Sequence, residues 1–123
     1  MAATESPLSD DVKKTMIRSG DMSTAVVGQS MDDPSHQIRN RLIDEIIALE
    51  AAYPKREAGE RVAPLIDRAW EDTMMNGCVE SGAVAAGPAV AYVKEIKPAS
   101  VILNDIIAET KRILAELYKK NPI

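Results

Sequence analysis

The sequence predicts a mostly α-helical fold with at most one short pair of β-strands. Three long segments, 34–52, 60–75 and 98–119, carry apolar residues at the spacing of one helix face. Aromatic residues make up only 3% of the 123 residues, and Phe is absent. The core must therefore be built from Ile, Leu, Val, Ala and Met, which is more typical of packed helices than of a β-sandwich. At this length the chain is one domain or part of one.

The N-terminal third is expected to hold one short helix and one strand. Ser9 can cap a helix over residues 10–18, whose first turn carries two aspartates. Residues 23–29 are the best strand candidate, because Val26 and Val27 are β-branched. One short strand is not stable alone, so its partner is either weakly signalled or absent from the chain.

The first long helix is predicted to begin at Asp33-Pro34, with Asp33 as the N-cap and Pro34 at the first helical position. It runs to about Ala52, and the pair Tyr53-Pro54 ends it. One apolar face is expected to carry Ile38, Leu42, Ile46 and Leu49, widened by Ile43 and Ile47.

A charged loop over residues 54–59 is expected to precede the second long helix, which covers about residues 60–75. Asn76-Gly77 then forms a turn or C-cap. The buried side of this helix is expected to carry Val62, Ile66, Ala69, Trp70 and Met74.

The last third combines a small-residue segment, 82–93, with a long amphipathic helix. Gly87-Pro88 marks a helix start, and Lys97-Pro98 opens the last helix, which runs to about Lys119. The apolar stripe of that helix consists of Ile102, Leu103, Ile106, Ile107, Ile113, Leu114, Leu117 and Tyr118. Its polar stripe consists of Asp105, Glu109, Arg112, Glu116 and Lys120.

Composition and charge argue against several classes of function. The net charge is −4 and the pI is near 5.0, which argues against a protein that binds nucleic acid through phosphate contacts. No apolar run approaches the roughly 20 residues that span a bilayer, and the N-terminus lacks the features of a signal peptide. The lone Cys78 cannot form an internal disulfide, so we expect a reducing, cytoplasmic setting.

The sequence offers no catalytic residue and no metal site. His36 is the only histidine, and as a residue in the first turn of a helix it is more readily a solvated side chain than a general base. Cys78 fits a small buried residue better than a nucleophile. One His and one Cys cannot supply the four ligands of a structural zinc site. The acidic residues fall on helix faces that should be solvated.

Ala86-Gly87 is the one candidate for contact with a ligand. Small residues let a backbone approach a ligand closely, and a helix that starts at Pro88 would offer free N–H groups to a phosphate. Close packing of this segment against a neighbouring element explains the same composition equally well.

Five short motifs occur in order along nearly the whole chain. They are Ala3-Thr4-Glu5-Ser6-Pro7 followed by Val12-Lys13; Thr24-Ala25-Val26-Val27; Ile38-Arg39-Asn40-Arg41-Leu42 followed by Glu45 and Leu49-Glu50; the segment Gly82 to Ala91; and Val93-Lys94-Glu95-Ile96-Lys97-Pro98 with the final helix. In order and spacing they resemble the C-terminal portion of the nitronate monooxygenase (2-nitropropane dioxygenase) family, which overlaps in sequence with the FMN-dependent enoyl-acyl-carrier-protein reductases.

The resemblance implies a part of a larger flavin enzyme. Members of that family are FMN-binding (β/α)₈ barrels with a smaller helical second domain inserted late in the barrel, about three times the length of this chain. By this resemblance, residues 1–81 correspond to the inserted domain and residues 82–123 to the terminal helices of the barrel. The catalytic histidine and most FMN contacts of the family lie upstream of the matching region.

The implied cofactor is FMN, held only when the missing barrel portion is supplied, with Ala86 and Gly87 as its contacts in this chain. Two departures weaken that contact: the family's Gln is Pro88 here, which lacks a backbone N–H, and a later Gly is Ala91.

Two functions follow as alternatives. In the first, the chain is a C-terminal fragment or subunit of an FMN-dependent oxidoreductase that acts on alkyl nitronates or nitroalkanes, and it is inactive alone. In the second, it is a non-catalytic helical module for interaction or oligomerisation. Under either, the stripe on helix 98–119 is expected to dock on a barrel portion or a partner chain, or to drive self-association.

Overall fold

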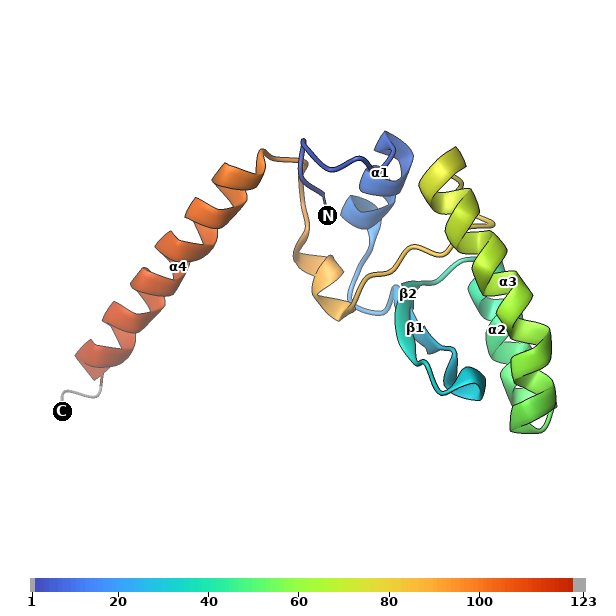
Figure 1. Cartoon of the computed structure of the whole chain (residues 1–123). Coiled ribbons are helices and arrows are strands. Elements are labelled where there is room, and N and C mark those ends of the chain that lie inside the picture. The colour runs from blue at the N-terminus through green and yellow to red at the C-terminus, as the bar shows by residue number, and fades with distance from the viewer. Residues whose placement is uncertain (1, 121–123) are drawn as a thin grey trace.

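The computed structural model describes residues 2–120, which form four α-helices, a two-stranded antiparallel sheet and two 3₁₀ turns (Figure 1). The predicted fold class, a small helical domain with a short pair of strands, is confirmed. The elements in order are α1 (Asp10–Arg18), β1 (Thr24–Val27), η1 (Gln29–Met31), β2 (Ser35–Ile38), α2 (Arg41–Ala52), α3 (Lys55–Asn76), η2 (Pro88–Tyr92) and α4 (Ala99–Lys120).

Helix α1 begins as its sequence predicts. The Ser9 hydroxyl accepts a hydrogen bond from the Val12 N–H at 3.3 Å, and two aspartates occupy the first turn. Val12 and Met16 are buried on the inner face of the helix. The cap and the apolar face together fix α1 against the rest of the chain.

The partner of β1 is β2, which pairs with it antiparallel from Thr24↔Ile38 to Val27↔Ser35. The connection between the strands uses two left-handed residues, Gly28 (φ 86°) and Asp32 (φ 59°). A Cβ on Gly28 would lie 2.4 Å from the Asp33 carbonyl oxygen, so only glycine fits this turn.

The predicted helix start at Asp33-Pro34 is therefore wrong. Residues 35–38 are a strand that is hydrogen-bonded along both edges: β1 lies on one edge, and the segment 84–86 on the other. Across that second edge, the Ile38 N–H donates to the Val84 carbonyl at 2.9 Å, and the Ala86 N–H to the His36 carbonyl at 3.1 Å. These pairings outweigh the local Asp-Pro signal for a helix. Ile38 is buried, as expected, but as part of strand β2 and not on a helix face.

Helix α2 begins at Arg41, seven residues after the predicted start at Pro34, and Asn40 is its N-cap. The Asn40 side-chain oxygen accepts from the Ile43 N–H at 2.9 Å, and its amide nitrogen donates to the carbonyls of Val79 (2.6 Å) and Gly82 (2.8 Å). The predicted end at Ala52 is confirmed, with Tyr53 as the C-cap.

The expected loop over 54–59 is also wrong, because α3 starts at Lys55, directly after Pro54. The charged residues of this stretch form ion pairs one helical turn apart, Arg56–Glu60 (3.3 Å) and Glu57–Arg61 (2.8 Å). The predicted C-cap is confirmed: Gly77 adopts φ 66°, and its N–H bonds to the end of the helix.

Two clusters of buried side chains form the core. One consists of Val27, Ile43, Ile46 and Val62, between the sheet and helices α2 and α3. The other consists of Ala2, Val12, Met16, Ile38, Val84 and Val90, and joins the N-terminal segment, α1, β2, the segment before η2 and η2 itself. Of the α3 residues predicted to be buried, Val62 and Ala69 are buried, whereas Trp70 and Met74 are 51% and 43% exposed.

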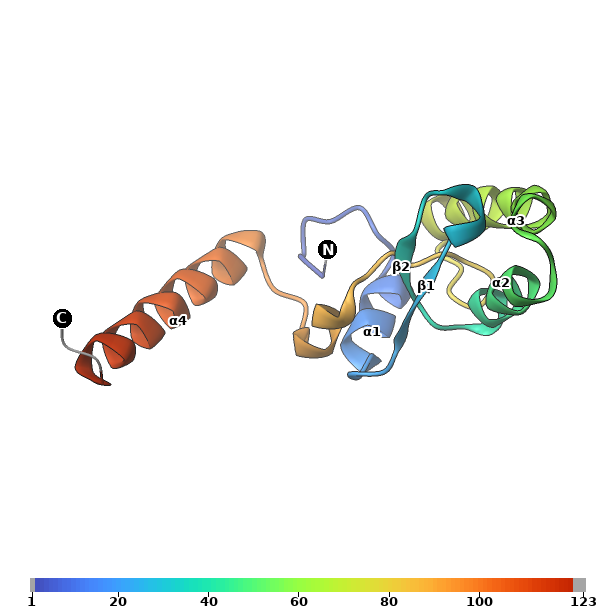
Figure 2. The ribbon, with the colours of Figure 1, turned by 90° about the horizontal axis from the view of Figure 1, so that it is seen from below.

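Helix α4 projects away from the rest of the molecule in both views (Figures 1 and 2). Its predicted start after Lys97-Pro98 is confirmed, and none of its residues is buried. Among the described residues, no helix combines the length and apolar character needed to cross a membrane.

Candidate functional site

Most of the exposed large apolar side chains in the described part of the chain lie on α4. Leu103, Ile106, Ile107, Leu117 and Tyr118 are each more than half exposed. We call the apolar stripe the set Ile102, Leu103, Ile106, Ile107, Ile113, Leu114, Leu117 and Tyr118. At 3.6 residues per turn these side chains span roughly 160° of the helix circumference. Because monomeric proteins rarely expose a contiguous apolar patch of several side chains, this surface is a candidate docking face.

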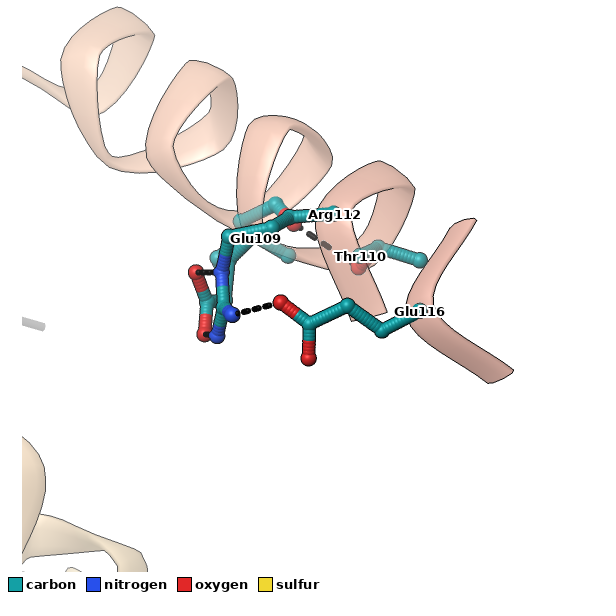
Figure 3. A network of polar contacts seen from close by, with 5 residues as sticks. Glu109, Thr110, Arg112 and Glu116 are labelled. Atoms are coloured by element: carbon teal, nitrogen blue, oxygen red, sulfur yellow. Dashed lines mark hydrogen bonds and ion pairs between the residues drawn. The ribbon is translucent and has the colours of Figure 1, made fainter. Parts of the chain in front are cut away.

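The polar side of α4 is organised by Arg112. Its guanidinium contacts the Glu109 carboxylate at 2.5 and 2.9 Å and the Glu116 carboxylate at 2.6 Å, one turn before and one turn after it (Figure 3). The Glu109 bond raises the pKa of Arg112, and Arg112 lowers the pKa of Glu109. These pairs keep the polar side in water and leave the opposite face for apolar contact.

Thr110 lies within the apolar stripe by its position, yet its hydroxyl does not interrupt it. The hydroxyl donates to the Ile106 carbonyl of the preceding turn at 2.7 Å (Figure 3). A partner surface at this position would therefore meet no unpaired hydroxyl hydrogen.

The base of α4 is tied to the N-terminal strap, which we define as residues 3–5. The Thr4 N–H donates to the Lys97 carbonyl at 2.9 Å, and Ala3 and Lys97 form an isolated parallel bridge. The Glu5 carboxylate accepts from the Ala99 N–H at 2.9 Å, which lowers the Glu5 pKa. The strap thus satisfies one of the free N–H groups in the first turn of α4.

Lys97 adds two ion pairs at the same place. Its ammonium contacts Asp105 at 2.8 Å and Glu95 at 2.9 Å, and these bonds raise the Lys97 pKa to about 12. Beside it, a groove of ≈ 400 Å³ lies between α4 and the body. Its walls include Tyr92 and Val93 from the body and Ile102 and Ile106 from the stripe.

The structure places Ala86 and Gly87 at the start of η2, a 3₁₀ turn of five residues. Ala86 is half-buried, and its N–H is already bonded to the His36 carbonyl. Gly87 is exposed, and a Cβ added there would meet nothing within 4 Å. Pro88 has no N–H. These residues therefore do not make a phosphate cradle by themselves, because at most the Gly87 N–H could donate.

The other candidate residues stay apart from one another. His36 lies exposed on β2, not in a helix as expected, and Cys78 is half-buried in the loop after α3. In the described part of the chain, no three His, Cys, Asp or Glu side chains are grouped so that they could hold a metal ion.

Sequence reasoning missed two residues that organise this region. Lys13 is only 5% exposed, and its ammonium donates to the Thr4 carbonyl of the strap at 3.4 Å. Glu5 was recognised as part of a motif but not as a cap for a helix 94 residues away. No local signal identifies either role, because the partners lie in other segments of the chain, 9 and 94 residues away.

Comparison with known proteins identifies similar folds. No family model matches this chain, and no curated protein does. The solved structure of FabK from Thermotoga maritima matches with a TM-score of 0.85 and 22% identity, over 97% of this chain and 37% of that chain. A methionine-to-alanine mutant of the same FabK matches with a TM-score of 0.75 and 21% identity, over 97% and 34%.

These matches concern the fold. The chain spans little more than a third of the length of the FabK structures it resembles. Nearly all of this chain, α4 included, is therefore folded like a part of FabK.

Proposed function

We propose that this chain is the C-terminal part, or a separate subunit, of an FMN-dependent oxidoreductase of the nitronate monooxygenase type, with alkyl nitronates or nitroalkanes as the substrate class. One observation carries the proposal: α4 exposes its apolar stripe, although the fold of this chain is only part of a larger fold. The match to FabK covers 97% of this chain but only 37% of FabK. A helix with that face needs a surface to cover it, and a remaining barrel portion would provide one.

The proposal assigns different roles to this chain and to the missing barrel portion. Residues 1–81 would form the second domain beside the active site, and residues 82–123 would close the barrel. FMN held by the barrel would supply the redox chemistry. The described residues do not by themselves form a site for the flavin, so no chemical step is assigned to them; Ala86 and Gly87 remain proposed contacts at its edge.

Equilibrium dialysis against FMN tests this proposal. The chain alone is expected to retain no stoichiometric flavin, because only one backbone donor is free at Ala86-Gly87. A chimera in which this chain replaces the matching segment of FabK should retain it. One FMN bound per copy of the chain alone would contradict an incomplete site.

A second candidate is a non-catalytic interaction module that associates through helix 98–119. Pro88 favours this function, since proline lacks the backbone N–H that could donate a hydrogen bond to a phosphate. In that case the chain would self-associate through the stripe, and the chimera would not hold FMN even when well folded. The near-ultraviolet circular dichroism of Trp70 would report whether the chimera is folded.

A further inference from the structure

The direction in which α4 leaves the body depends on few contacts. None of its residues is buried, and its apolar contact with the body is limited to the groove lined by Ile102 and Ile106, so apolar packing holds it only weakly. The connection before it, residues 94–98, contains no helix or strand. A long helix on such a connection would take many orientations unless specific bonds at its base restrained it.

The N-terminal strap supplies those bonds. Its backbone is joined to Lys97 through the Thr4 N–H, and its Glu5 carboxylate bonds to the Ala99 N–H. The two contacts lie on either side of Pro98, so they fix both the end of the connection and the first turn of the helix. The negative charge of Glu5 also lies at the positive end of the helix dipole.

The strap is itself anchored to the core. Ala2 is 6% exposed and belongs to the same buried cluster as Val12 and Met16 of α1. The nearly buried Lys13 ammonium, also from α1, donates to the Thr4 carbonyl. Thr4 thus bonds to α1 through its carbonyl and to the base of α4 through its N–H.

We propose that the N-terminal strap is a conformational clasp, in which Glu5, far away in the sequence, caps α4 and fixes the direction in which the helix leaves the body. With the clasp closed, α4 is a rigid arm, and the part of its stripe beyond the groove stays exposed. With the clasp open, α4 turns about residues 94–98. This inference does not depend on the flavin or on the barrel, because it concerns only contacts within the chain.

Pulsed electron paramagnetic resonance tests the clasp by measuring the distance between spin labels on native Cys78 and on Lys111→Cys. Lys111 is exposed on α4, and the ion pairs of this helix among the described residues involve Asp105, Glu109, Arg112 and Glu116 instead. Labelled protein is diluted with unlabelled Cys78→Ser protein, so that distances between copies do not contribute. The intact chain is expected to give one narrow distance peak.

Glu5→Ala is expected to lose that narrow peak, because the Ala99 N–H then has no acceptor in the strap. Glu5→Gln retains an acceptor oxygen and should keep a narrower distribution than Glu5→Ala. The matched control is Glu57→Ala, which removes an exposed glutamate paired with Arg61 on α3 and should leave the peak unchanged.

Hydrogen exchange separates an open clasp from an unfolded protein. In Glu5→Ala the Thr4 and Ala99 amides should exchange faster, while amides of β1, β2 and α2 stay protected. The proposal is overturned if Glu5→Ala gives the same distance peak as the intact chain, if Glu57→Ala broadens the peak equally, or if the intact chain already lacks a narrow peak.

Discussion

At the scale of single residues, Gly82 and Gly87 of the same segment differ in the space available for a side chain. A Cβ on Gly82 would lie 2.1 Å from the Cys78 carbonyl oxygen and 2.2 Å from the Thr73 hydroxyl, whereas one on Gly87 would meet nothing. Gly82→Ala should therefore destabilise the fold by about 1–3 kcal/mol, as overpacking does. Gly87→Ala should leave the free energy of unfolding, measured in urea, within about 0.5 kcal/mol of that of the unsubstituted chain.

Equal stabilities of the two variants would contradict the packing described for the loop after α3. Gly87→Ala also serves the flavin proposal, since it adds a methyl group at the proposed contact without disturbing the fold. In a flavin-retaining chimera, it should weaken FMN binding if Gly87 lies against the phosphate.

Asn40 joins three parts of the chain through one side chain. It caps α2 and donates to two carbonyls in the loop after α3. Asn40→Ala should reduce the free energy of unfolding by about 2–3 kcal/mol, from the lost cap and two unpaired carbonyls. Asn40→Asp keeps the cap but not the donors, so chemical denaturation should show a stability clearly below that of Asn40. If the two variants match the parent chain, the loop is held by other contacts.

At the scale of elements, the ion pairs of α4 make a prediction about pH. Arg112 lowers the pKa of Glu109 below its ordinary value of 4.5. Because the folded-state pKa of Glu109 lies below its unfolded-state pKa, the ion pair stabilises the folded helix at pH values above the ordinary pKa. This stabilisation is lost as the pH falls through the lowered, folded-state pKa. In a carboxyl NMR titration, Glu109 should titrate below 4.5 and return toward it in Arg112→Ala. A Glu109 that titrates normally in the intact chain would contradict the pairing.

Local signals predicted elements whose causes are local. Ser9 as a cap, Gly77 at a helix end and the Lys97-Pro98 start of α4 all depend on a few adjacent residues, and the structure confirms each. The strand β2 could not be predicted in this way. It is held by β1 and by the segment 84–86, almost 50 residues away, and these bonds outweigh the helix signal of Asp33-Pro34.

The error at 54–59 has a different cause. The sequence prediction treats residues 54–59 as a charged loop between two helices. Its acids and bases are spaced four apart, which supports a helix. A Cβ on Gly59 would lie 3.0 Å from the Ser30 carbonyl oxygen, so the glycine serves the close approach of η1 and does not break the helix.

At the scale of the whole molecule, the candidate docking face on α4 was predictable from the sequence, but the N-terminal strap that holds the base of α4 was not. The stripe follows from helical periodicity alone, so the sequence identified all eight of its residues. The strap that orients it joins residue 5 to residue 99, and the Ala86 N–H is taken by His36 from another element. Pairings of this kind depend on the tertiary fold and leave no local signal.

The central claim is that the apolar stripe of α4 is a docking face and not an incidental exposed surface. Glutamate substitutions at two adjacent positions test this claim, because they add the same negative charge inside and outside the stripe. Leu114 belongs to the stripe and is 49% exposed, whereas Ala115 lies on the opposite side of the helix. Both substitutions to Glu should leave the fold intact, because no residue of α4 is buried.

The most direct measurement is sedimentation velocity over a wide range of protein concentration, on the intact chain, Leu114→Glu and Ala115→Glu. The intact chain and Ala115→Glu should self-associate as concentration rises when no other partner covers the stripe, and Leu114→Glu should remain monomeric. An intact chain that stays monomeric at the highest concentration, or a Leu114→Glu chain that associates as strongly as Ala115→Glu, would contradict the claim.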